Sequence, residues 1–288
     1  MKQILVLSGK GGTGKTTVAG AFAGLAAPCV IADCDVDAAN LHIILSPKEG
    51  EVNFFYGGKK AFIDPVKCVN CGYCAKLCRF EAISFPPHRV NELSCEGCGV
   101  CVWNCLTGAI TLKESLSGRW SVSECRLGPF VGARLEPSAE NSGKLVALLK
   151  KEAVKIAEAV KARYLILDGA PGIGCPVLAS LSGIDAVVVV AEPTISGRSD
   201  FIRLAELLKN QGMRTFLLVN KWDINPQETE NIERIALDFG FKISGRIPFD
   251  IKVVETMLNK KVLSEVPDFP AAVEIKKAWN FLVSDLKE

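Results

Sequence analysis

Two cysteine runs with the same spacing constrain this chain more than any other feature of its sequence. Each run has the pattern Cys-x2-Cys-x2-Cys-x3-Cys and is followed, at one fixed distance, by the dipeptide Ala-Ile. The first run holds Cys68, Cys71, Cys74 and Cys78, and the second holds Cys95, Cys98, Cys101 and Cys105. Matching segments of this kind indicate copies of one structural unit, so we expect both runs to fold together.

The spacing favours iron–sulfur clusters over the other uses of cysteine. Thiolates two residues apart can bind one face of a cubane, and the fourth cysteine of each run is far enough along the chain to reach the neighbouring cluster. Zinc sites more often combine pairs of cysteines or add histidine, and a reducing cytosol disfavours disulfides.

Both runs resemble the bacterial two-cluster ferredoxin family, which implies two 4Fe-4S clusters held crosswise. The resemblance assigns one cluster to a first set of ligands, Cys68, Cys71, Cys74 and Cys105. It assigns the other cluster to a second set, Cys95, Cys98, Cys101 and Cys78. That family usually has proline after the fourth cysteine of a run, where this chain has Arg79 and Leu106.

The amino-terminal segment carries a phosphate-binding loop. Residues 9–17 match G-x-x-x-x-G-K-[ST], with an apolar strand-like segment before them at 3–8 and a small-residue helical segment after them at 16–26. In such a loop the glycine N–H groups approach phosphates, Lys15 neutralises them and Thr16 offers its hydroxyl to magnesium. The residues expected to bind the nucleotide are Gly11, Gly12, Thr13, Gly14, Lys15, Thr16 and Thr17.

The rest of the chain alternates strand-like and helix-like segments. Buried-strand composition occurs at 29–33, 164–167, 186–191, 215–219 and 242–247, and helical spacing at 144–160, 203–209 and 230–239. This predicts an α/β P-loop NTPase with a mainly parallel sheet covered by helices on both faces. The cysteine runs interrupt the alternation, and 120–125 is a candidate strand returning to the sheet. We therefore expect a discontinuous ATPase domain, 1–55 and 120–288, with an inserted ferredoxin-like domain at 56–119.

A second lysine in the loop, Lys10, resembles the deviant Walker A motif of the MinD, ParA and nitrogenase iron protein class, to which the Mrp-type carriers are related. In that class the lysine contacts nucleotide across a dimer interface. The resemblance implies a homodimer that sandwiches two ATP molecules, with Lys10 and Lys15 both acting in catalysis.

Two acidic segments resemble the switches of the same class. The segment 33–37 resembles the first switch, where a carboxylate orients or deprotonates the attacking water, and Asp35 is favoured among Asp33, Asp35 and Asp37. The segment 165–172 resembles Walker B and the second switch, with Asp168 on magnesium through water and Gly172 near the γ-phosphate. The implied magnesium site therefore combines Thr16, Asp35 and Asp168.

Two later segments resemble base-binding loops. Residues 220–223 (Asn-Lys-Trp-Asp) follow a strand, and Asn220 has both a donor and an acceptor for an adenine edge. Residues 247–250 resemble the adenine-lining loop and include Pro248. Asn-Lys-x-Asp also occurs in GTPases, so guanine is an alternative, and the family resemblance favours ATP.

Two further features allow more than one interpretation. Cys175 follows Asp168 at the offset where the nitrogenase iron protein carries a bridging-cluster ligand, but such a cluster needs two cysteines per chain and Cys125 is the nearby spare one. The apolar spacing of 271–287 suits either core docking or a membrane-binding helix as in MinD. Its charges cancel, which favours docking.

The charge and hydropathy of the chain limit the classes of partner that we expect. A formal net charge of +2 gives no reason to expect nucleic acid. No apolar stretch is long enough to span a bilayer, no signal peptide is apparent, and we expect no membrane partner and a cytoplasmic location.

The combined motifs predict an ATP-hydrolysing homodimer whose clusters serve iron–sulfur or metallocofactor assembly, or redox delivery, with a protein acceptor or donor as partner. One alternative is an ATP-gated electron-transfer reductase component. Another is a positioning ATPase of the ParA or MinD kind, in which the clusters are only structural.

Overall fold

The computed structural model describes residues 1–136, 141–266 and 268–287, which form two units. Unit 1 comprises Met1–Val52, Trp120–Arg134 and Ser142–Glu288, and unit 2 comprises Asn53–Arg119 and Leu135–Asn141. Positions 137–140, 267 and 288 of the predicted ATPase range lie outside the described residues.

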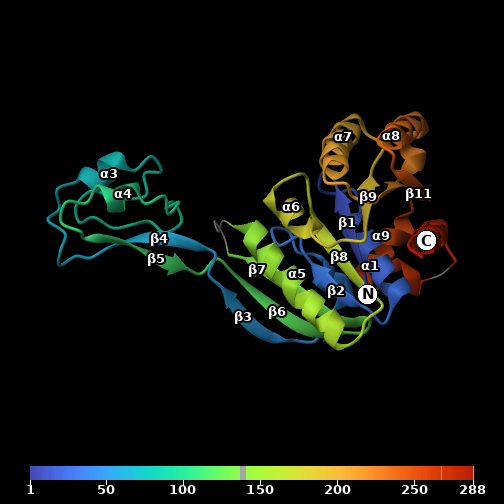
Figure 1. Cartoon of the computed structure of the whole chain (residues 1–288), viewed down its shortest axis with the longest axis horizontal. Helices are drawn as coiled ribbons and strands as arrows, with labels where there is room; N and C mark the ends of the chain where they lie inside the picture. The colour runs from blue at the N-terminus through green and yellow to red at the C-terminus, as the bar shows by residue number, and fades with distance from the viewer. Residues whose placement is uncertain (137–140, 267, 288) are drawn as a thin grey trace. The chain divides into compact units, whose positions relative to one another are not determined.

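The main sheet has the strand order β11-β10-β9-β1-β8-β2-β7-β6-β3 (Figure 1). Its parallel pairs join β1 to β8 and β9, β2 to β7 and β8, and β10 to β9 and β11. The bounds of these strands are β1 Lys2–Ser8, β2 Val30–Asp33, β7 Gly128–Leu135, β8 Tyr164–Pro171, β9 Ala186–Ala191, β10 Thr215–Asn220 and β11 Lys242–Ile247. The predicted α/β P-loop fold with a mainly parallel sheet is confirmed.

The sheet extends beyond β7 through β6 (Gly118–Cys125) and β3 (Glu51–Phe55). Only Arg126 and Leu127 join β6 to β7, and so short a link forces an antiparallel hairpin. The sequence indicated only part of β6, because these strands are half-exposed and lack the continuous apolar runs of the buried strands.

Both faces of the parallel core are covered. Along β1, Ile4 and Val6 alternate with Leu5 and Leu7, and all four side chains are 0% exposed. Ile4 and Val6 pack in the cluster that includes residues of α1 and α10, whereas α5 and α6 contact β8 outside that cluster. The helices of unit 1 are α1 (Lys15–Ala26), α2 (Leu41–Leu45), α5 (Ser142–Ala159), α6 (Cys175–Leu181), α7 (Ile195–Asn210), α8 (Pro226–Asp238), α9 (Ile251–Leu258) and α10 (Pro270–Asp285), with 3-10 turns at Trp222–Ile224 (η1) and Leu263–Glu265 (η2).

The carboxy-terminal helix α10 packs in the core of unit 1. The Trp279 ring lies 5.2 Å from the Phe22 ring and 5.3 Å from the Tyr164 ring, and Ile275 and Leu282 are buried beside it. This is the docked arrangement that the cancelled charges of the segment favoured. Within the described part of the chain, none of the helices has the length and apolar character needed to cross a bilayer.

Unit 2 contains an antiparallel pair, β4 (Gly58–Ile63) and β5 (Ile110–Ser115), and two short helices, α3 (Tyr73–Leu77) and α4 (Val100–Trp103). Each helix follows a glycine in the left-handed region, Gly72 at φ 77° and Gly99 at φ 80°. Most side chains are strained in that conformation, so glycine is favoured at both positions.

The two cysteine runs of unit 2 adopt the same backbone path. Three left-handed positions occur at matching places, Asn70, Gly72 and Glu81 in the first copy and Gly97, Gly99 and Gly108 in the second. The Asp64 N–H donates to the Ala109 carbonyl at 2.8 Å, and the matching Asn91 N–H donates to the Ala82 carbonyl at 2.7 Å. The start of each copy is therefore bonded to the end of the other.

Candidate nucleotide site and cysteine cavity

The phosphate-binding loop joins β1 to α1 and requires glycine at several positions. Gly12 and Gly14 have φ of 82° and 95°, and an added Cβ at Gly11 or Gly12 would meet no described atom within 4 Å. An added Cβ at Gly9 would lie 2.6 Å from the Asp200 backbone in α7. The loop is thus held closely against α7 at its start and open where its N–H groups would approach phosphates.

Lys15 is the centre of a buried charge cluster. Its Nζ lies 2.8 Å from Asp168 Oδ1 and 3.1 Å from Asp35 Oδ2, and the residue is only 5% exposed. Burial lowers the pKa of the Lys15 ammonium, but the charges and hydrogen bonds of Asp168 and Asp35 outweigh burial and raise it. The three predicted site residues are therefore brought together, with Lys15 charged.

Asp33 has a different place from Asp35. It lies beside Asp168 in the register of β2 and β8, and its two oxygens accept the backbone N–H groups of Asp35 and Leu41 at 3.2 and 3.1 Å. Burial and the neighbouring Asp168 raise the pKa of Asp33, and burial raises that of Asp168. Asp33 thus braces the segment between β2 and α2, whereas Asp37 is exposed.

The donors around Asp168 fit a magnesium ion. Asp168 Oδ2 is buried with no hydrogen-bond partner among the described residues, and the nearby Thr16 side chain opposes the rise that burial causes in the pKa of Asp168. Mg²⁺ prefers oxygen ligands and commonly takes one or two carboxylates together with phosphates and water. The set predicted from sequence, Thr16, Asp35 and Asp168, is chemically suited to that ion. Nowhere in 1–136, 141–266 or 268–287 do three or more Cys, His, Asp or Glu side chains converge to hold an ion by themselves.

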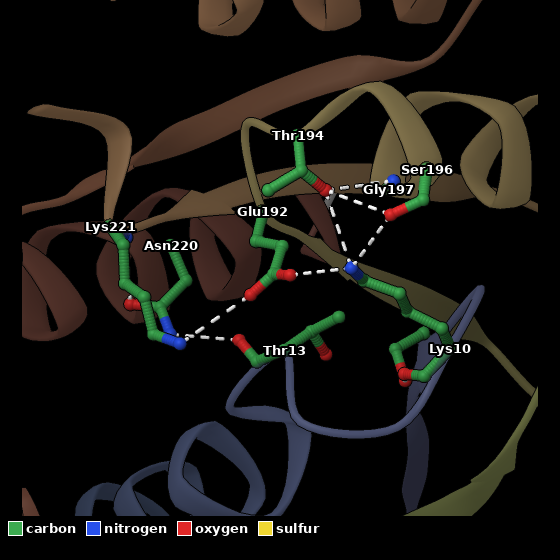
Figure 2. A network of polar contacts seen from close by, with 9 residues as sticks. Lys10, Thr13, Glu192, Thr194, Ser196, Gly197, Asn220 and Lys221 are labelled. Carbon is green, nitrogen blue, oxygen red and sulfur yellow. Dashed lines mark hydrogen bonds and ion pairs between the residues drawn. The ribbon is translucent and has the colours of Figure 1, made fainter. Parts of the chain in front are cut away.

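Lys10 is held by side chains of its own chain (Figure 2). Its Nζ lies 2.6 Å from Glu192 Oε1, 3.1 Å from Ser196 Oγ and 3.3 Å from Thr194 Oγ1. Glu192 follows β9, and its second oxygen lies 3.4 Å from Lys221 Nζ. Glu192 was not identified from the sequence, although a carboxylate directly after a buried strand was an available signal.

The two predicted base-binding loops lie together. Asp223 Oδ1 accepts the N–H of Phe249 at 2.7 Å, which joins the segment 220–223 to the loop containing the half-buried Pro248. Asn220 Nδ2 donates to the Thr13 carbonyl at 2.8 Å, and its Oδ1 accepts the Lys221 N–H at 3.0 Å. Both polar atoms of the Asn220 amide are therefore engaged within the protein.

Thr17, the last predicted loop residue, contacts a neighbouring helix. Its hydroxyl lies 3.3 Å from the Met257 sulfur in α9. The loop is thereby linked to the helix that follows the segment 247–250.

Unit 2 contains a cavity of ≈ 260 Å³ lined by all four cysteines of the second set, Cys78, Cys95, Cys98 and Cys101. The Ala82 N–H donates to Cys78 Sγ at 3.4 Å and the Ala61 N–H to Cys95 Sγ at 3.5 Å. Donors that point at sulfur are a recognised means of tuning iron–sulfur clusters. Because each thiolate of a cubane binds a different iron, four such sulfurs need not converge as the ligands of one ion do.

In the first set of cysteines, Cys74 and Cys105 have different surroundings. Burial raises the pKa of Cys74, and nearby Cys68 and Cys71 raise it further. Burial would raise the pKa of Cys105, but hydrogen bonds from the Thr107 side chain and from backbone N–H groups, including that of Ala109, outweigh it and lower the pKa. The Ala109 bond to Cys105 is the counterpart of the Ala82 bond to Cys78.

The remaining cysteines lie in unit 1. Cys29 and Cys34 are buried, and burial raises the pKa of Cys29 to about 12. Cys175 is exposed at the start of α6, and Cys125 is half-buried at the end of β6, where it packs against the core.

Comparisons with known proteins bear on the whole chain. The family profile described as the CobQ/CobB/MinD/ParA nucleotide binding domain matches residues 4–263. The uncharacterized protein MJ0578 of Methanocaldococcus jannaschii is 32% identical over 268 residues, which are 91% of this chain and 90% of that protein. A shorter match, 33% identical over 55 residues, links 19% of this chain to 67% of the pyruvate synthase subunit PorD of Methanothermobacter marburgensis.

Solved structures show the same fold at low sequence identity. MinD of Pyrococcus horikoshii, determined with Mg-ADP, is similar at a TM-score of 0.61 and 16% identity, covering 100% of this chain and 98% of that one. The MinC:MinD cell division complex of Aquifex aeolicus is similar at a TM-score of 0.59 and 19% identity, covering 99% and 96%. The phosphate-binding loop, the acidic strand ends and the extent of the family match together lead to one conclusion: the chain belongs to the CobQ/CobB/MinD/ParA family of nucleotide-binding proteins.

Proposed function

We propose that the protein is an ATP-hydrolysing homodimer that carries two 4Fe-4S clusters and serves iron–sulfur or metallocofactor assembly, or redox delivery, to a protein partner. The observation that carries the proposal is the presence, in one chain, of a buried Lys15–Asp168 nucleotide site and of a cavity lined by Cys78, Cys95, Cys98 and Cys101. The first supplies a nucleotide-driven change, and the second supplies a place for a cluster.

Hydrolysis would use positioned charges rather than covalent chemistry. Lys15 and Lys10 would stabilise charge on the transferred phosphoryl group, and Asp35, held within 3.1 Å of Lys15, would orient the attacking water. Thr16 and Asp168 are the residues that would hold Mg²⁺, and bound Mg²⁺ supplies charge neutralisation at the phosphates. Asp33 would keep the segment carrying Asp35 in place through its two backbone hydrogen bonds.

The family resemblance favours adenine as the base, and so ATP as the substrate. Asp223 Oδ1 accepts the Phe249 N–H, which joins the segment 220–223 to the loop of Pro248.

The clusters would be held crosswise, each by three cysteines of one run and the fourth cysteine of the other. The crosswise backbone bonds of the two copies support this arrangement, because Asp64 binds Ala109 and Asn91 binds Ala82. When bound, the clusters supply storage and transfer of single electrons. The sulfur ligands are oriented by N–H donors such as that of Ala82, which would tune the reduction potential.

A path for coupling nucleotide to clusters begins at Arg126, in the turn between β6 and β7. Its guanidinium donates to the Ile44 and Leu45 carbonyls at the end of α2 and pairs with Glu265. α2 directly follows the first-switch segment, and the far ends of β6 and β7 continue into residues of unit 2. A shift of the first switch would therefore act on the hairpin that leads into the cysteine unit.

The partner is best sought among enzymes. The short match to a subunit of the enzyme pyruvate synthase supports looking for the partner among enzymes. The likeness to MinD structures concerns the fold alone, so it gives no specific support to cell positioning.

Oxygen-free purification tests the proposal. Iron and sulfide counts with EPR should report two 4Fe-4S clusters per chain, and Lys10→Ala should abolish ATP turnover while leaving the iron content unchanged. Transfer of iron and sulfide to an apo-protein, or of electrons to an acceptor, measured with and without ATP, separates assembly from redox delivery. A colourless protein, or full turnover in the Lys10 variant, would refute the proposal.

A further inference from the structure

The Lys10 ammonium lies at the amino-terminal end of helix α7, which is electrostatically unfavourable for a cation. This ammonium contacts Thr194, the N-cap residue of α7, and Ser196 in the first turn (Figure 2). The amino-terminal end of a helix carries a partial positive charge, which repels a cation. The first turn of α7, residues 195–198, contains no Asp or Glu to offset this charge.

Glu192 supplies the missing negative charge. Its Oε1 lies 2.6 Å from Lys10 Nζ, and both side chains are partly exposed, at 16% and 27%. Without this carboxylate, the ammonium would face the helix end with only hydroxyl partners. The place of Lys10 on its own chain therefore depends on Glu192.

The same carboxylate is shared with a second lysine. Glu192 Oε2 lies 3.4 Å from Lys221 Nζ, and Lys221 is fixed next to it by a left-handed backbone at φ 57° and by its N–H bond to Asn220. Asn220 in turn donates to the Thr13 carbonyl. The contacts thus run from Lys10 through Glu192, Lys221 and Asn220 back to the loop that carries Lys10.

We propose that Glu192 is a positioning residue that retains Lys10 on its own chain, and that Lys221 sets the strength of this hold by competing for the same carboxylate. The inference rests on the proposed function, in which Lys10 leaves this place to act on nucleotide across the dimer. By holding Lys10, Glu192 then raises the dimer dissociation constant without touching the phosphates. Lys221, in the base-binding segment, lowers that constant by weakening the hold.

Two substitutions with opposite expected signs test the proposal. Lys10 acylation by a small amine-reactive ester is followed by mass spectrometry in the nucleotide-free, full-length protein. Glu192→Gln keeps the shape but removes the charge, and should speed Lys10 labelling roughly three- to tenfold. Lys221→Met leaves Glu192 to Lys10 alone and should slow the labelling. Glu206→Gln, an exposed position on α7, is the matched control and should leave the rate unchanged.

Dimerisation provides the functional readout. With a non-hydrolysable ATP analogue, sedimentation should give a lower dimer dissociation constant for Glu192→Gln and a higher one for Lys221→Met. Labelling of Glu192→Gln at the wild-type rate, or a change of the same sign in both variants, would overturn the inference. A wild-type protein that never dimerises with nucleotide would instead refute the proposed function, because the labelling does not depend on dimer formation.

Discussion

Replacing Lys15 with methionine tests the charge balance of the nucleotide site through protein stability alone. Among the residues that the structure describes, Lys15 is the one ammonium within hydrogen-bond distance of Asp35 and Asp168, and Asp33 lies beside Asp168 on the adjacent strand. Methionine has a similar shape but leaves these buried carboxylates without their cation. Removing one partner of a buried pair typically costs about 3–5 kcal/mol in unfolding free energy.

The pH dependence of this loss follows from the carboxylates. Burial already raises the pKa of Asp33 and Asp168 above the ordinary value of 3.8. A carboxyl whose folded pKa is raised destabilises the fold above that pKa, and the penalty disappears as the pH falls toward the unfolded value. Lys15→Met raises both pKa values further, so its penalty should be larger near about pH 7.5 than near about pH 5.

Urea unfolding of the wild type and the variant at both pH values measures these differences directly. Lys10→Met is the matched control in the same loop, since its partly exposed ion pair with Glu192 should contribute only about 0–1 kcal/mol. Added Mg²⁺ should recover part of the stability lost in Lys15→Met, because it supplies positive charge to the same carboxylates. A Lys15→Met protein as stable as the wild type, or a loss that does not change with pH, would refute the reasoning.

Three further results are expected. Cys78→Ser should remove about half of the iron, because it removes a ligand of one cluster. Adding Cys98→Ser, on the same cluster, should remove no more iron, whereas adding Cys71→Ser, on the other cluster, should remove the rest. The reversed pattern in iron and EPR assays would exclude crosswise ligation. Trp279→Ala should lower the unfolding free energy by about 3–5 kcal/mol in chemical denaturation, and a loss below about 1 kcal/mol would show that α10 is not needed by the core. Lys150 lies in α5, where burial lowers its pKa to about 8, against an ordinary value of 10.5, so wild-type stability relative to Lys150→Met should rise between these pH values. This rise in unfolding free energy should be about 1 kcal/mol after solvent screening, and a fall with rising pH would contradict a lowered Lys150 pKa.

The sequence located the buried strands and the amphipathic helix α5 closely, but it missed the start of α7. The predicted strands at 186–191 and 215–219 match β9 and β10 to within one residue, because their continuous apolar runs leave little freedom. α7, predicted at 203–209, begins at Ile195. Its first two turns hold Ser, Gly and Arg and lack apolar periodicity, and the Thr194 cap was the available signal.

The candidate site was predictable where parallel strands end. Asp33 ends β2, and Asp168 directly follows the predicted strand 164–167, so the sequence could place both carboxylates at one edge of the sheet beside Lys15. The strand itself, β8, continues through Asp168 to Pro171. The division of labour among the carboxylates was not predictable, because it depends on hydrogen-bond geometry. Asp33 accepts two backbone N–H groups, whereas Asp35 faces Lys15.

Lys15 and Lys10 differ in the ion pairs that each must break before it can bind phosphate. Lys15 exchanges contacts with Asp168 and Asp35 that are almost fully buried, with side-chain exposures of 6%, 0% and 10%. Phosphate brought without a cation would leave those carboxylates buried and unpaired, so Lys15 can serve phosphate only when positive charge replaces it at Asp168, which a bound Mg²⁺ would provide. Lys10 gives up a partly exposed pair with Glu192, which water can solvate afterwards. Of the two, Lys10 is therefore the residue free to move, and Lys15 remains tied to the presence of the metal.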